Sequence, residues 1–117
     1  MSAERDTGAF QSAHTKTIVV PVARAYAAWE DADLRREWLG EDAGFEIREA
    51  TPERSLRIAW IDGQTTVSVS FYANGRAKSQ VQVIHEGFPD AGTAERVKAY
   101  WGERLERLRV LLEGSRG

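Results

Sequence analysis

The stretch TTVSVSFYANGRAKSQVQVIH (residues 65–85) decides the fold, because polar and apolar side chains alternate along most of it with a period of two. That period is typical of β-strands with one buried face and one solvated face. The triplet NGR (74–76) separates the two alternating segments and is rich in turn-forming residues. The stretch therefore predicts an antiparallel hairpin with one apolar face.

The length of the loop sets the register of this hairpin. A two-residue loop would place the valines of one strand opposite polar side chains of the other. A three-residue loop, Asn74–Arg76, instead pairs Val69 with Val81 and Thr65 with His85. Apolar side chains then face apolar side chains, so we expect the three-residue loop.

Further strands precede this hairpin in the chain. They are KTIVVPV (16–22), FEIREA (45–50) and SLRIAWI (55–61). A two-residue turn at Asp62-Gly63 pairs Ile58 with Val67, and a four-residue loop, TPER, pairs Phe45 with Trp60. The apolar rows continue across the strands, which indicates one antiparallel sheet with a single face to cover.

Helical patterns supply that cover. ARAYAAWED (23–31) and DADLRREWLG (31–40) predict two short helices, the second capped by Asp31 and ended by Gly40. After Asp90, a fair N-cap, apolar residues recur at intervals of three and four in a long helix. They are Val97, Trp101, Leu105, Leu108 and Leu112. The order predicts an α+β domain of about five strands (β-α-α-β-β-β-β-α) packed on the C-terminal helix.

Composition narrows the functional classes. The chain has 117 residues, no cysteine and a net charge of -2, so it offers no broad basic field for nucleic acid or anionic membrane. It has no secretory pattern and no run near the ~20 apolar residues of a membrane helix. We expect a cytoplasmic protein with one domain over residues 13–113, and disordered tails over residues 1–12 and 114–117.

Three segments resemble one protein family. YAAWEDADLRREWL resembles the helix pair of the START/SRPBCC superfamily, and LRIAWIDG resembles its strand that ends in tryptophan. The segment VIHEGFPDAGTAERVKAYWGERLERLRVLLEG is similar to the end of the branch named for the activator of heat-shock-protein ATPase. The resemblance implies a helix-grip fold. GEDAG (40–44) leaves no room for the β-hairpin that family members usually carry there, so we expect a shortened version.

His85 is the most informative candidate residue. The register turns it inward beside Thr65 and near Trp60. The structural interpretation is a neutral imidazole bonded to the Thr65 hydroxyl or a loop carbonyl. The functional interpretation is a polar anchor at the mouth of a pocket. A general base is the weakest interpretation, because no oriented partner is evident and Glu86 points to the opposite face.

The remaining candidates are aromatic. Trp29, Trp38, Phe45, Trp60 and Trp101 would form the walls of an apolar pocket rimmed by Thr65 and His85, or would simply pack the core. We expect no metal site, since the chain has two histidines and no cysteine, and we expect no cofactor.

Three functions follow, from different classes. The first is a non-enzymatic domain that binds a small apolar or aromatic ligand between the sheet and the C-terminal helix. The second is a protein-interaction or co-chaperone-like module with a filled core. The third, an enzyme such as the cyclases or hydrolases of the resembled superfamily, requires at least two titratable groups in one pocket, and only His85 is evident.

Overall fold

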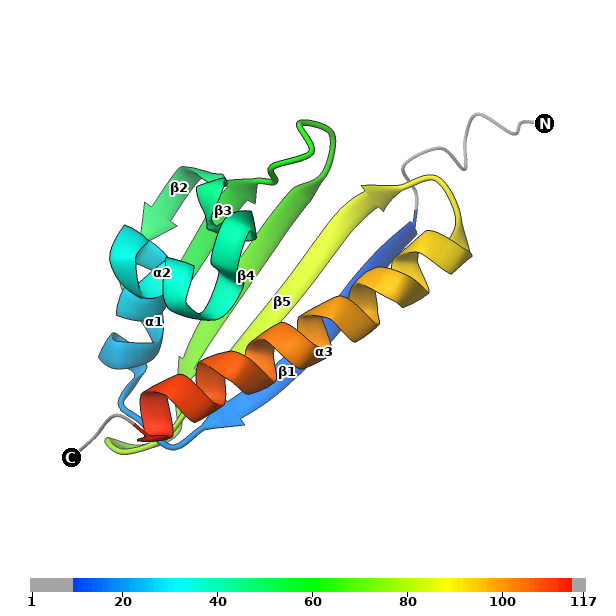
Figure 1. The fold of residues 1–117 in the computed structure, drawn as a ribbon. Helices are drawn as coiled ribbons and strands as arrows, with labels where there is room; N and C mark the ends of the chain where they lie inside the picture. The colour runs from blue at the N-terminus through cyan, green and yellow to red at the C-terminus, as the bar shows by residue number, and fades with distance from the viewer. Residues whose placement is uncertain (1–9, 115–117) are drawn as a thin grey trace.

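The computed structural model describes residues 10–114 and contains five strands, two short α-helices, a 3-10 helix and a long C-terminal α-helix (Figure 1). In chain order the elements are β1 (Phe10–Ile18), α1 (Val22–Glu30), α2 (Ala32–Leu39), η2 (Gly40–Gly44), β2 (Glu46–Thr51), β3 (Ser55–Ala59), β4 (Thr66–Ala73), β5 (Ser79–Phe88) and α3 (Ala91–Gly114). The strands form one antiparallel sheet in the order β1-β5-β4-β3-β2. The predicted α+β class and element order are confirmed.

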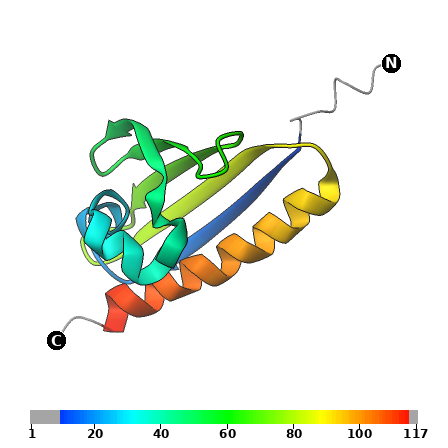
Figure 2. The ribbon, with the colours of Figure 1, turned by 45° about the horizontal axis from the view of Figure 1, so that its top comes forward.

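All the helices lie against one face of the sheet (Figure 2). α3 runs along β1 and β5, while α1 and α2 cover the half of the sheet that contains β4. η2 is the only element between α2 and β2 in the described chain, so the connection is short and contains no hairpin, as expected. The five residues of GEDAG make up η2 and leave none for two further strands and a turn.

The first strand differs from the prediction. β1 begins at Phe10 and ends at Ile18, whereas the apolar run KTIVVPV predicted residues 16–22. Pro21 lies at the start of α1 and lacks the N–H that a strand interior needs, so the chain leaves the sheet after Ile18. Residues 10–12, which the prediction placed in the tail, pair with β5. The other residues of the two predicted tails, except Gly114 in α3, lie outside the described residues.

The predicted helix caps are present. Asp31 Oδ1 accepts hydrogen bonds from the N–H groups of Asp33 and Leu34, at 2.9 and 3.1 Å. Gly40 ends α2 with a φ of 65°, which a glycine adopts without steric strain. Asp90 Oδ1 accepts from the Thr93 N–H at 2.7 Å at the beginning of α3. The positions of these helix ends could therefore be predicted from single residues.

The register of β3 against β4 follows the prediction, but both predicted loops differ. Thr51 pairs with Ser55, so three residues and not TPER form the β2–β3 loop, and the Gly63 N–H donates to the Trp60 carbonyl in place of a two-residue turn at Asp62-Gly63. Ile58 pairs with Val67, and the Trp60 N–H donates to the Thr65 carbonyl at 3.1 Å. Ile47 pairs with Ile58 as expected, but a bulge follows it and moves the next pairs by one residue. The inner face of this part of the sheet is consequently apolar, as the alternation predicted.

The predicted register of β4 against β5 is wrong by two residues. The loop comprises residues 75–77, closed by a 2.8 Å hydrogen bond from the Asn74 N–H to the Lys78 carbonyl. Val67 therefore lies opposite His85, and Phe71 lies opposite Val81. Because the side-chain period of a strand is two, a shift by two keeps every residue on its predicted face. The observed register is better packed, since it gives the buried Phe71 an apolar partner.

Candidate functional site

His85 lies in the interior, at the end of the sheet where β3 and β4 are connected. Only 2% of its surface is exposed. The imidazole is surrounded by the rings of Trp60, Phe88 and Trp101, with centroid distances of 5.3, 4.8 and 6.1 Å. A polar group in such an apolar cage is stable only when its hydrogen-bonding atoms are satisfied.

Both imidazole nitrogens have partners. The Trp101 Nε1–H donates to His85 Nδ1 at 3.0 Å. An indole N–H is only a donor, so Nδ1 carries no proton and the neutral ring carries its proton on Nε2. Nε2 then donates to Thr65 Oγ1 at 2.8 Å, and this hydroxyl is one of the two partners that the structural interpretation named. The bond from Trp101 was not predicted, because nothing in the spacing of α3 indicates which strand residue its indole meets.

The chain of hydrogen bonds ends on Asp62. The Thr65 hydroxyl donates to Asp62 Oδ2 at 2.7 Å, and the backbone N–H groups of Gln64 and Thr65 donate to Oδ1 at 2.8 and 2.9 Å. Partial burial opposes ionisation of this carboxyl, but the three hydrogen bonds prevail and hold the pKa of Asp62 below its ordinary value. The sequence indicated only a turn at Asp62, so this role was not predicted.

Gly87 lets β5 approach the Asp62 turn. Its φ is 108°, a conformation that side chains disfavour, and a Cβ at this position would lie 3.5 Å from the Thr65 Cα. In the observed register Gly87, and not His85, is directly across from Thr65. The imidazole therefore reaches the Thr65 hydroxyl along the diagonal.

The environment keeps His85 neutral. Burial lowers the pKa of His85 from 6.5 to about 4, although the Asp62 carboxylate pulls in the opposite direction. Protonation would also place an N–H on Nδ1 against the Trp101 N–H. A ring with both nitrogens engaged and no exposed edge has no lone pair to offer a substrate, so the geometry does not favour a general base.

The lowered pKa predicts a loss of stability in acid. Unfolded His85 binds a proton near pH 6.5, whereas folded His85 binds one only near pH 4, so the stability is complete above pH 6.5 and falls as the pH drops towards 4. For this group alone we expect a loss of about 2.5 kcal/mol between pH 7.5 and pH 4.5. Urea unfolding of the wild type and of His85→Gln at both pH values isolates the contribution, because the other groups cancel. If the wild type and His85→Gln lost the same free energy of unfolding between the two pH values, the acid sensitivity would not come from the lowered pKa of His85.

The predicted pocket walls come together in one aromatic cluster. Trp29 stacks on Trp101 with centroids 5.7 Å apart, and Trp38 packs edge-on against Trp29 at 4.7 Å. Trp60 lies 5.7 Å from Phe45 and 5.3 Å from Trp101. Three of the four indoles are fully buried, Phe45 is nearly so, and Trp60 keeps a partly exposed edge. The rings thus contact one another across the space where a ligand was predicted, and ligand binding by these residues stays a prediction.

Two buried indole N–H groups in this cluster differ in whether they have a hydrogen-bond partner. The Trp38 Nε1–H donates to the Ala28 carbonyl at 3.0 Å. Within residues 10–114, the buried Trp29 Nε1–H has no hydrogen-bond partner. An unsatisfied buried N–H is costly, so the Trp29 side of the cluster is its least satisfied part.

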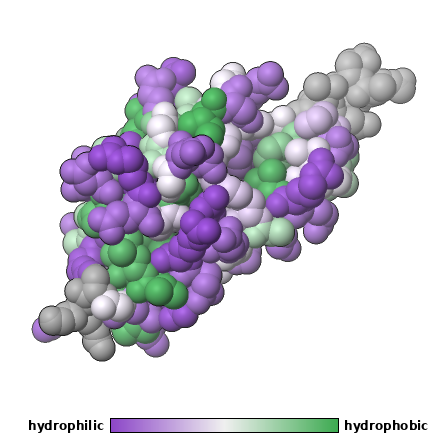
Figure 3. Space-filling view, viewed as in Figure 1, coloured by the Kyte–Doolittle hydropathy of each residue, from purple (hydrophilic) through white to green (hydrophobic). Residues whose placement is uncertain are grey.

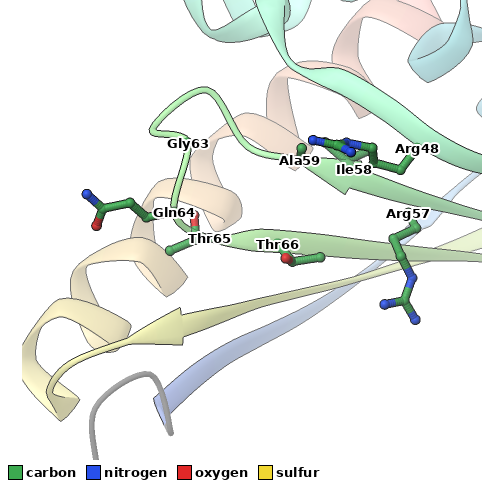
Figure 4. A pocket seen from close by; sticks show the side chains of 8 residues that line it. All are labelled: Arg48, Arg57, Ile58, Ala59, Gly63, Gln64, Thr65 and Thr66. Carbon is green, nitrogen blue, oxygen red and sulfur yellow. The ribbon is translucent and has the colours of Figure 1, made fainter.

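Several hollows open on the surface of the described chain, and five of them have volumes of about 250 to 430 Å³. The four indoles line none of these five. One hollow of about 300 Å³ lies beside the β3–β4 turn (Figure 4) and includes Thr65 in its lining. Its two arginines are paired on the sheet surface, Arg48 with Glu46 at 3.4 Å and Arg57 with Glu49 at 3.7 Å. It therefore resembles a solvated sheet surface more than a binding site.

A second polar cluster joins η2 to α3. The Tyr100 hydroxyl donates to Asp42, and the Arg104 guanidinium lies 5.0 Å above the Tyr100 ring and 4.0 Å from the same carboxylate. Burial and the bond to Asp42 raise the pKa of Tyr100. The side chains hold η2 over the aromatic cluster and so close that end of the domain.

Other ligand chemistry has little support in the described residues. His14 lies in β1, where a Cβ on Gly102 would be 3.3 Å from its ring, and burial together with Lys16 and Lys98 lowers the pKa of His14. Within residues 10–114, histidine and acidic side chains form no group of three that could hold a metal ion. The same part of the chain contains no helix that is long and apolar enough to cross a membrane.

The fold and the cluster define an α+β helix-grip domain, and solved structures agree. No family model matches the sequence, and no curated protein matches it. A protein from Mesorhizobium loti has a TM-score of 0.79 at 16% identity, over 92% of this chain and 100% of its own. The Aha1 dimer structure from Colwellia psychrerythraea gives a TM-score of 0.75 at 16% identity, over 92% and 99%. An HSP90 activator from Plasmodium falciparum gives 0.72 at 18% identity, over 89% and 96%.

The structural neighbours are thus Aha1-like, SRPBCC-type proteins, as the sequence resemblance implied. At these identities the likeness establishes the fold alone.

Proposed function

We propose that this chain is a non-enzymatic protein-interaction domain of the co-chaperone-like kind. The observation that carries the proposal is the aromatic packing of the interior: Trp101 packs against both Trp29 and Trp60 between the sheet and α3. When the interior is occupied by the protein's own rings, recognition takes place on the surface. The neighbour described as an HSP90 activator supports the class of function and says nothing about the partner of this chain.

The chemistry of His85 supports the non-enzymatic part of the proposal. Catalysis by acids and bases requires titratable groups that converge on a substrate. His85 is neutral, enclosed and bonded on both nitrogens, and Asp62 is occupied by three hydrogen bonds. The hydrogen-bonded chain acts as a structural brace between the β3–β4 turn and α3.

Photo-crosslinking in the cells that produce the protein tests the proposal. A photoreactive residue is placed in turn at the four exposed large apolar positions, Val19, Ile61, Tyr72 and Val110, and at the exposed polar control Thr15. We expect at least one apolar position to yield an adduct of one defined mass that Thr15 does not yield. The adduct is identified, and the purified pair is titrated by calorimetry. Absence of a defined adduct at all four positions, or of measurable binding by the purified pair, would refute the proposal.

A small apolar ligand is the second candidate, and the unpartnered Trp29 Nε1–H favours it. A ligand with an acceptor oxygen would satisfy this N–H after entering the aromatic cluster. Native mass spectrometry of the protein purified without denaturant tests the idea. A bound mass that raises the Tm, and that is lost in Trp29→Phe while the fold is kept, would support ligand binding; an empty protein would exclude it.

A further inference from the structure

Two apolar hollows lie side by side between the short helices and the C-terminal half of α3. One, of about 430 Å³, lies between α2 and α3, and the other, of about 330 Å³, also reaches α1. Glu37 and Leu111 line both, so the two form one continuous depression, the α2–α3 groove. Figure 3 shows apolar surface beside the C-terminal part of α3, with hydrophilic surface around it.

Apolar side chains from all three helices line the α2–α3 groove. Leu34 and Ala27 contribute from the short helices, and Leu111 contributes from α3. Val110 of α3 lies at the edge of the groove, with 55% of its surface exposed. Exposed apolar surface often marks an interaction site, and a hydrophobic groove can accept the apolar face of an amphipathic helix.

The charges around the groove differ in how well they are satisfied. Glu103 is paired with Arg107 at 3.1 Å, and Glu106 is paired with Lys16 at 2.7 Å and with Arg109. Glu37 is exposed, and within the described residues no ion pair or hydrogen bond engages its carboxylate. Three acidic side chains (Glu37, Glu103 and Glu106) and two basic ones (Arg24 and Arg107) line the two hollows, so the groove carries a net negative charge, and Glu37 lies where the hollows meet.

We propose that the α2–α3 groove binds an amphipathic helical segment of a partner protein, with apolar side chains at helical spacing and a lysine or arginine that pairs with Glu37. Charge complementarity selects this occupant over a second copy of the chain, since a copy docked through the same patch would bring its own Glu37 towards an acidic rim. The inference rests on the proposed protein-interaction function and specifies its surface.

The test uses two synthetic helical peptides of 16 residues, identical except for one side chain. Both carry three leucines at spacings of four and three, and the position beside the leucine stripe is lysine in one peptide and glutamate in the other. Binding is measured by fluorescence anisotropy, and the site is mapped by amide chemical shifts of the full-length protein. We expect the lysine peptide to bind more tightly and to shift the amides of Leu34, Val110 and Leu111.

Variants of the protein sharpen the test. Val110→Ser should weaken binding by about tenfold, because it removes the buried contact of one valine. Ile61→Ser, at an exposed apolar position in the β3–β4 connection, should leave binding unchanged. Glu37→Lys should reverse the preference and favour the glutamate peptide by about threefold. Thermal melts verify that the three variants fold.

Three outcomes would overturn the proposal that the α2–α3 groove binds a helix. They are no binding of either peptide at millimolar concentration, amide chemical-shift changes that map outside the groove, or a preference for the lysine peptide that Glu37→Lys does not reverse. The protein-interaction function fails separately. A defined crosslinked partner at Val19, Ile61 or Tyr72, together with no binding in the groove, leaves that function standing and refutes only its surface.

Discussion

Trp101→Ala should lower the free energy of unfolding by about 3–5 kcal/mol, as removal of a large buried aromatic side chain usually does. Trp101 is fully buried, stacks on Trp29 and packs against Trp60, and its indole N–H donates to His85. The alanine variant would lose these ring contacts and leave an unsatisfied nitrogen. Urea unfolding followed by circular dichroism measures the change.

Trp101→Phe is the matched control, because it keeps an aromatic ring and removes the N–H. We expect it to cost about 1–3 kcal/mol, most of it from the unsatisfied His85 Nδ1 and the smaller ring. If the phenylalanine variant lost as much stability as the alanine variant, the hydrogen bond and not the packing would dominate. If the alanine variant lost less than about 1 kcal/mol, the aromatic cluster would not be the core of the domain.

His85→Ala should lower the free energy of unfolding by about 3 kcal/mol, since it leaves the Trp101 N–H and the Thr65 hydroxyl without their buried partner. The neighbouring Glu86→Ala should cost less than about 0.5 kcal/mol, because this side chain lies on the opposite face of β5. The two residues are adjacent, so the contrast reports only which face each occupies.

Chemical denaturation of the two variants at pH 7.5 measures the contrast. Equal losses, or a larger loss for Glu86→Ala, would mean that the register of β5 is off by an odd number of residues. Thr65→Val gives an independent check: it keeps the shape of the side chain, removes the link between His85 and Asp62, and should also be destabilising.

Much of the fold could be predicted because local chemistry encodes it. Asp31 and Asp90 cap their helices with short side chains that accept backbone N–H groups, and Gly40 ends α2 in a conformation that suits glycine. The start of β1 was missed because Phe10–Thr15 contains polar and small residues. That segment is a strand through its pairing with β5, and pairing with a distant segment leaves no trace in local periodicity.

The candidate site was predicted only in part. The contact between His85 and Thr65 followed from the facing of two strands, although the register behind it was wrong by two residues. The bond from Trp101 could not be predicted, because the rotation and height of α3 over the sheet depend on packing along the whole helix. The role of Asp62 was missed because an aspartate before a glycine already suffices to indicate a turn. Nothing in that pattern shows that its carboxylate also accepts a hydrogen bond from the Thr65 hydroxyl.

The sequence by itself determined which face of β3, β4 and β5 is buried and where the capped ends of α2 and α3 lie, since these depend on the alternation of side chains and on single capping residues. Tertiary structure alone decided the register of β4 against β5. Any even shift preserves the faces, and the packing of Phe71 against Tyr26 and Trp29 selects one of the alternatives. It also brought the aromatic side chains together: Trp101 packs against both Trp29 and Trp60, and these contacts depend on the distance between α3 and the sheet.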